Sequence, residues 1–178
     1  MTGFVMGLIY AGGYVWLENG PPIWATAIIY VALLVTVWFD FDHYRIPNWI
    51  SLPKIAGGLG FAFYTQRAAF AQHILGAIAG YGLVWLLNIY WRKRRGVEGI
   101  GMGDAKLLAA AGAWLGIFAL PLVTLISSGA ALLTILLNAL AQSKPINAKM
   151  RIPFGPFIAI GFWTIWVAHP VLRLVTAA

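Results

Sequence analysis

The sequence predicts an all-α, polytopic transmembrane helical bundle with about six or seven spans. Three observations support this class: 61% of the 178 residues are hydrophobic, only 10% are charged, and the mean hydropathy is +0.83. Water-soluble proteins contain roughly 45–50% apolar and ~25% charged residues. A soluble globule is therefore excluded, and we expect residues 1–178 to form a single membrane-embedded domain.

The predicted spans are uncharged apolar stretches that end at charged residues, glycines or prolines. The first stretch lacks a basic n-region and a cleavage site, so it is predicted to be a short span and not a removable signal. Residues 105–141 would form a helix of ~55 Å, nearly twice the thickness of the hydrocarbon core, so we expect Pro121 to divide them. The spans are residues 2–17, 22–39, 50–64, 68–91, 105–119, 122–141 and 154–174.

The basic residues orient these spans. With the amino terminus inside, only Arg67 and Arg173 of the twelve lysines and arginines fall on the outer side, as the positive-inside rule requires. The net charge of +7 thus reflects topology, and no nucleic-acid partner is expected. The basic run 92–95 is expected to bind the anionic headgroups of the lipid bilayer.

Cofactor chemistry is not indicated. The chain contains no cysteine, which excludes disulfides, thiol catalysis and cysteine-based metal sites. Three scattered histidines do not form a His-rich metal site. We therefore expect no metal and no organic cofactor.

Asp40 and Asp104 are the strongest candidates for chemistry among the five acidic residues. Asp40 closes the second predicted span and Asp104 opens the fifth, so the two complete spans between them bring both to the cytoplasmic face. Ionisable groups near membrane depth are costly and persist chiefly where they are used. Asp104 follows a glycine-rich stretch and could instead be a helix N-cap, but a carboxylate at a helix C-terminus, such as Asp40, is disfavoured by the macrodipole.

Two neighbouring carboxyl groups do not both ionise easily, so they share a proton, activate water and protonate a leaving group. The helix ends predict that Asp104 is the more readily ionised member and Asp40 the more readily protonated, by ~1 pK unit.

Three ordered blocks resemble the type IV prepilin peptidases, which are membrane aspartic proteases of the GxGD class. The blocks are Asp40-x5-Ile46-Pro47-Asn48-x3-Leu52-Pro53, then Gly101-x-Gly103-Asp104-x-Lys106-Leu107-Leu108 with Gly112-Ala113-Trp114-Leu115-Gly116, and Ile152-Pro153-Phe154-Gly155-Pro156-Phe157-Ile158-Ala159. The resemblance implies an aspartic endopeptidase of the bacterial inner membrane with its active site facing the cytoplasm, and Asp40 and Asp104 as the catalytic pair. Its substrates would be type IV prepilin or pseudopilin precursors, from which it removes a short basic leader.

The same resemblance suggests residues that shape the site or bind substrate: Asp42, Pro47, Asn48, Gly101, Gly103, Lys106, Pro153 and Gly155. Pro47 is expected to terminate the second span, although an ordinary helix stop would look the same. Lys106 could affect a neighbouring carboxyl group, but an interfacial lysine is the simpler interpretation. Asp42 and Glu98 are candidates to meet the basic leader.

Larger members resembling this family carry an additional amino-terminal cytoplasmic region, often with paired cysteines, that is linked to N-methylation. Only 39 residues precede Asp40 here and none is a cysteine, so a peptidase-only form is expected.

Rival classes are a proton-coupled transporter, a noncatalytic assembly factor and a presenilin-like protease. A transporter predicts carboxylates near the bilayer midplane, whereas both aspartates lie at a boundary. The sequence leaves open the precursor, the choice among pilus, type II secretion and DNA uptake, the oligomeric state and the resting distance between the carboxyls.

Overall fold

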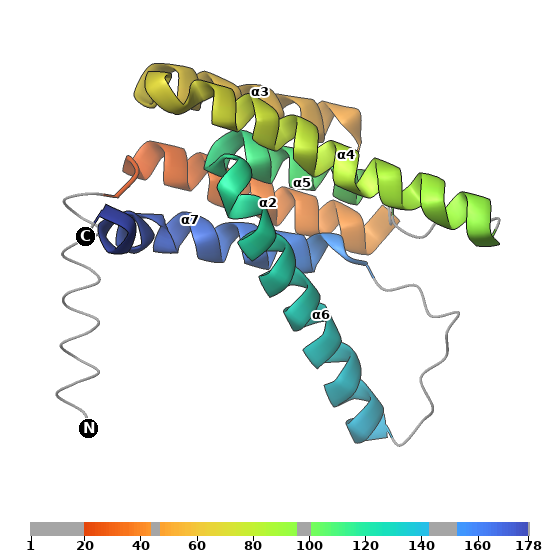
Figure 1. Cartoon of the computed structure of the whole chain (residues 1–178). Helices are drawn as coiled ribbons and strands as arrows, with labels where there is room; N and C mark the ends of the chain where they lie inside the picture. Colours follow the sequence, from red (N-terminus) through yellow and green to blue (C-terminus); the bar gives the residue numbers. More distant parts are fainter. Residues whose placement is uncertain (1–19, 44–46, 96–100, 143–152, 178) are drawn as a thin grey trace, which may run out of the picture.

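The computed structural model describes residues 20–43, 47–95, 101–142 and 153–177. These residues form six α-helices and two short 3₁₀ turns, without a strand, which confirms the all-α class (Figure 1). In chain order they are α2 (Ile23–His43), α3 (Asn48–Thr65), η1 (Arg67–Ala69), α4 (Phe70–Arg95), α5 (Met102–Leu115), η2 (Ile117–Ala119), α6 (Leu120–Gln142) and α7 (Gly155–Ala177).

Three helical stretches of the described chain are long and apolar enough to cross a membrane: Ile23–Phe41, Arg67–Arg94 and Ile117–Ala141. They coincide with the second, fourth and sixth predicted spans. The third, fifth and seventh predicted spans are also helices, although α3 and α5 do not meet this criterion. The first predicted span lies outside the described residues.

Helix α5 occupies the centre of the bundle, between α3, α4 and α7 (Figure 1). From Ala105 to Leu115 nearly all of its residues are buried, because small alanine and glycine side chains allow neighbouring helices to approach closely. The approach is closest against α4, where a Cβ atom built on Gly112 would lie 2.2 Å from the carbonyl oxygen of Gly76. The α4 and α5 backbones are therefore in direct contact.

The predicted division of residues 105–141 at Pro121 was placed too late. The chain turns at Gly116, which has a φ of +83°, a value that L side chains rarely adopt. Pro121 lies in the first turn of α6, where a missing N–H group is tolerated. A glycine at the end of α5 thus makes the break, and the proline follows it.

Pro47 has a further role that the sequence did not predict. Helix α2 ends at His43, and Pro47 is the N-cap of α3, where its carbonyl accepts the N–H groups of Ile50 and Ser51, each at 3.2 Å. The fixed φ of proline suits a helix start, and here it measures −64°. Pro47 therefore begins a helix.

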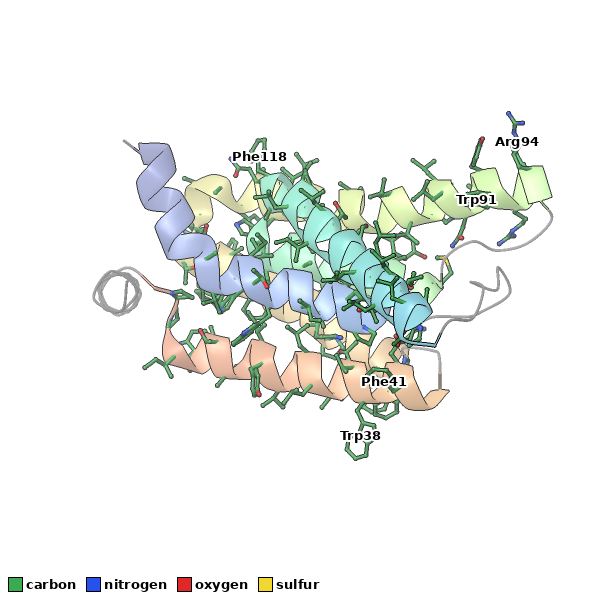
Figure 2. The ribbon with its side chains drawn as sticks, turned by 90° about the horizontal axis from the view of Figure 1, so that it is seen from below. Trp38, Phe41, Trp91, Arg94 and Phe118 are labelled. Carbon is green, nitrogen blue, oxygen red and sulfur yellow. The ribbon has the colours of Figure 1, made fainter. Side chains whose placement is uncertain are left out.

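Large apolar side chains cover the outside of the bundle. Trp38 and Phe41 point away from α2, and Phe118 projects from the opposite end of the molecule (Figure 2). Helix α6 packs mainly on α7, and its C-terminal half leaves the bundle (Figure 1) with five exposed leucines, at positions 132, 133, 136, 137 and 140. A surface of this kind is typical of helices in a hydrocarbon solvent.

Candidate active site

Asp40 lies in the last turn of α2 and is only 6% exposed. Its Oδ2 atom accepts a hydrogen bond of 3.1 Å from the N–H group of Gly155, the first residue of α7. The first N–H groups of a helix have no partner within the helix and carry the positive end of its dipole. The start of α7 therefore stabilises a negative charge on Asp40.

Gly155 can make this contact because it has no side chain. A Cβ atom built there would lie 2.5 Å from Oδ2 and 2.9 Å from Cγ of Asp40. Any other residue would displace the carboxyl group. Gly155, which the sequence placed in the last block, thus contacts Asp40 across 115 positions of the chain.

Asp104 is the third residue of α5 and is 8% exposed. The N-cap of this helix is Gly101, whose carbonyl accepts the N–H group of Asp104 at 3.1 Å, so Asp104 is not the capping residue. Asp104 precedes the stretch 105–119 that was predicted to enter the membrane. Burial, and then the charge of Asp40, raise the pKa of Asp104 to about 7.

The two carboxyl groups thus lie close enough to interact electrostatically. They lie where α2 ends and where α5 and α7 begin, which we call the aspartate end of the bundle. The helix ends had predicted Asp104 as the more readily ionised member. Burial raises the pKa of both carboxyl groups, and at Asp40 the N–H group of Gly155 counteracts this rise, so these contacts favour Asp40 as the more readily ionised member.

Asn48 and Lys106 contact each other at the same end. The Lys106 ammonium donates to Oδ1 of Asn48 at 2.5 Å, in an exposed position that links the start of α3 to α5. Lys106 is therefore bound by an amide.

The remaining predicted residues lie around this pair or outside the described chain. A Cβ atom on Gly101 would meet Asp104 Oδ2 at 3.5 Å, an ordinary contact, and Gly103 lies in the first turn of α5. Pro153 directly precedes Phe154 and the start of α7. The side chain of Asp42 and the whole of Glu98 are outside the described residues. Within the described ranges, no group of three or more His, Asp or Glu residues could hold a metal ion.

Sequence reasoning missed two buried polar groups near Asp40, namely Thr36 and Lys54. Thr36 precedes Asp40 by one helical turn, and Lys54 donates a hydrogen bond to its hydroxyl group. The signal in the sequence was Lys54 itself, a single lysine inside the apolar stretch 50–64. It entered the prediction only as one of the basic residues that orient the spans.

Comparison with known families addresses the nature of this site. A model of the type IV leader peptidase family matches residues 27–136. The chain belongs to this family. The match includes Asp40, Asp104 and Gly101, whereas Gly155 lies beyond it.

Curated members of the leader peptidase family are similar over most of this chain. The prepilin leader peptidase/N-methyltransferase of Aeromonas hydrophila is 42% identical over 149 residues, which cover 80% of this chain and 49% of that protein. Its namesake from Neisseria gonorrhoeae is 32% identical over 186 residues, covering 96% of this chain and 61% of that protein. The chain thus spans about half the length of the curated relatives it matches. No solved structure shows a significant match.

Proposed function

We propose that this protein is a membrane aspartic endopeptidase that removes the short basic leader from type IV prepilin or pseudopilin precursors. The observation that carries the proposal is the pair of buried, interacting carboxyl groups of Asp40 and Asp104 at one end of the bundle. Membership of the leader peptidase family and the similarity to prepilin leader peptidases support the cleavage of a leader peptide. The reaction is hydrolysis of one peptide bond.

The contacts of the pair suggest a division of roles. Asp40, whose charge is stabilised by the Gly155 N–H group, takes a proton from a water molecule as that water attacks the scissile carbonyl carbon. Asp104, protonated near neutral pH, donates its proton to the carbonyl oxygen. When the tetrahedral intermediate collapses, the C–N bond breaks and the leaving amine takes the proton that Asp40 had gained. Asp104 then recovers its proton from the oxygen as the new carboxyl group forms.

The charge pattern supports a reaction at the cytoplasmic boundary of a bacterial inner membrane. Exposed Arg92, Lys93 and Arg94 end α4, with Arg94 at its tip (Figure 2), and the positive-inside rule assigns them to the cytoplasm. These residues suit anionic lipid headgroups better than a basic leader, which they would repel. The leader is expected to meet acidic groups, with Asp42 and Glu98 as the candidates.

The test is co-expression with a pilin-like precursor in a bacterial membrane, with the leader followed by gel shift and mass spectrometry. Asp40→Asn and Asp104→Asn should each reduce cleavage by about 10³-fold, because each removes a proton-transfer group that the other cannot replace. Glu18→Gln makes the same chemical change at a position predicted to lie on the other face, and it should cleave normally. Cleavage retained by either aspartate variant, at normal membrane levels, would refute the proposed pair.

A further inference from the structure

Lys54 is a buried cation that the proposed reaction does not use. Its side chain is 9% exposed, and its ammonium donates a hydrogen bond across the bundle to the hydroxyl group of Thr36 on α2. Its backbone carbonyl accepts a 2.8 Å bond from the indole N–H group of Trp114 on α5. Lys54 is thus fixed between three helices and does not extend to the lipid interface as a snorkelling lysine would.

The amine has few polar partners for a charged group. Thr36 donates its own hydroxyl proton to the carbonyl of Ala32 at 2.7 Å, so only its lone pairs are available to Lys54. Among the described side chains, no carboxylate forms an ion pair with this amine. Burying an ammonium group with one neutral partner is unfavourable, and such groups in membrane proteins are retained chiefly where they have a function.

The place of Lys54 relative to the aspartates suggests that function. Thr36 and Asp40 are four residues apart on α2, so they share one face and lie ~6 Å apart along the axis. Both are buried. Side chains of a helix lean toward its N-terminus, and α3 begins at the aspartate end, so the Lys54 side chain leans toward the pair. The hydroxyl group that the ammonium contacts therefore lies about one helical turn from Asp40.

We infer that Lys54 is a positioning residue for the Asp40–Asp104 pair. Its positive charge lowers the pH range in which the pair carries a single proton. The inference rests on the proposed function. A buried positive charge favours loss of a proton from both carboxyl groups, and the screening by water is weak there. Burial of Asp104 acts in the opposite direction.

Other titratable groups on the helices around α3 are not placed to do this. Lys106 of α5 is exposed and donates to Asn48, and the Nδ1 atom of His73 on α4 lies 3.0 Å from the Ala113 carbonyl. Arg67 of η1 stacks over Phe63 on the outside. The described side chains of α7 include no charged group. The remaining titratable groups of α3 and α4 are exposed: Tyr64, Tyr81, Tyr90, Arg92, Lys93 and Arg94.

The first experiment is the pH profile of kcat/KM for precursor cleavage by the full chain in membranes. In Lys54→Met the acidic and the alkaline limb of this profile should both move to higher pH by about one unit. In Lys54→Arg, which keeps the positive charge, both limbs should lie at the wild-type pH values. Ser51→Ala is the matched control, because Ser51 is buried on the same helix but binds only the Pro47 carbonyl, and its profile should not move. Lower activity in Lys54→Met with unmoved limbs would show a merely structural role and overturn the inference.

A second measurement does not depend on cleavage. The infrared band of protonated carboxyl groups is titrated in the purified protein, and Asp40→Asn and Asp104→Asn assign its components. The band of Lys54→Met should persist to about one pH unit higher than that of the wild type. If the wild type fails to cleave the precursor, the proposed function is wrong, but this titration still tests Lys54. If the wild type and Lys54→Met titrate identically, the role of Lys54 alone is overturned.

Folding of the neutral variant is expected, since Thr36 keeps its bond to Ala32 and an apolar side chain avoids the burial of charge. Lys54→Gln is a second neutral variant that retains a donor for Thr36, and it should titrate as Lys54→Met does. If both neutral variants fail to fold while Lys54→Arg folds, the charge serves the fold and the inference is wrong.

Discussion

The contact between α4 and α5 and the aspartate end of the bundle are built in opposite ways. Between α4 and α5 the backbones touch: Cβ atoms built on Gly80 and Gly112 would lie 2.5 Å from Leu108 O and 2.2 Å from Gly76 O. At the aspartate end, Asp40, Lys54 and Asp104 are buried with few hydrogen bonds. The first region provides close packing, whereas the second keeps ionisable groups in an unfavourable environment.

This difference shows how the pair is held. Helix α5, which carries Asp104, is fixed along its length by α4 and α3, whereas α2, which carries Asp40, packs chiefly on α7. The N–H group of Gly155, at the start of α7, donates a hydrogen bond to Asp40. The relative position of the two carboxyl groups should therefore depend more on the start of α7 than on the centre of the bundle.

The largest effect is expected from Gly112→Ala in the α4–α5 contact. The new methyl group would lie 2.2 Å from a backbone oxygen that cannot rotate away, so the helices must separate. Overpacking of this kind costs about 3 kcal/mol, enough to abolish most folded protein. Thermal unfolding in detergent and the amount of protein in the membrane measure it.

Gly129→Ala is the control for this prediction. No atom lies within 4 Å of a Cβ built at Gly129, and alanine favours the helix by roughly 0.5–1 kcal/mol, so this variant should be no less stable than the wild type. Equal melting of both variants would show that the close contact between α4 and α5 does not determine stability.

Gly155→Ala should damage activity more than stability. Its methyl group would lie 2.5 Å from Asp40 Oδ2 and would move a side chain, not a backbone. Misplacement of a catalytic group by about 1 Å can cost roughly 10²-fold, so cleavage should fall by about that factor. The cleavage rate and the melting temperature of the same preparation separate the two effects.

Gly101→Ala is the matched change beside the other aspartate. Its methyl group would meet Asp104 Oδ2 at 3.5 Å, an ordinary contact, so a change in cleavage of only a few-fold is expected. If Gly101→Ala were as damaging as Gly155→Ala, the start of α7 would have no special influence on the pair.

Much of the helical framework was predictable because the hydrophobic stretches are long and end at charges or helix breakers. The predicted stretch 22–39 became part of α2, and 122–141 became part of α6. The error at residues 105–141 came from assigning a helix end by residue type alone. Pro121 lies at a helix start, since a proline is compatible with the first turn of one helix as well as with the end of another.

The contacts of the candidate site were less accessible to sequence reasoning. Spacing and topology brought Asp40 and Asp104 to one face, but the bond from Gly155 joins residues 115 positions apart and follows from how α7 packs on α2. The predicted order of ionisation used helix dipoles, each worth roughly 0.3–1 kcal/mol. Burial and this one long-range bond outweigh them.

A further effect is expected from pH, and its sign follows from the burial of Asp104. The pKa of Asp104 is raised from 3.8 to about 7, so the carboxyl group keeps its proton in the folded protein where the unfolded chain would lose it. Between about pH 4 and pH 7 the folded state therefore loses stability as pH rises. Above pH 7 this group causes no further change in stability. Asp104→Asn removes the contribution of this group. The melting temperature of the variant should therefore be higher than that of the wild type at pH 8 and close to it at pH 4.

In the proposed mechanism, cleavage depends on the same proton. If Asp104 must be protonated to donate to the carbonyl oxygen, kcat/KM should fall about tenfold for each pH unit above pH 7. The two measurements are linked, because one group governs both the alkaline limb of the cleavage profile and the difference in melting temperature. A flat cleavage profile from pH 6 to pH 9, together with a melting difference that still depends on pH, would leave Asp104 as a buried acid without a role in proton transfer. A shared midpoint near pH 7 would instead mean that the buried environment that weakens the fold at this end also supplies the proton for catalysis.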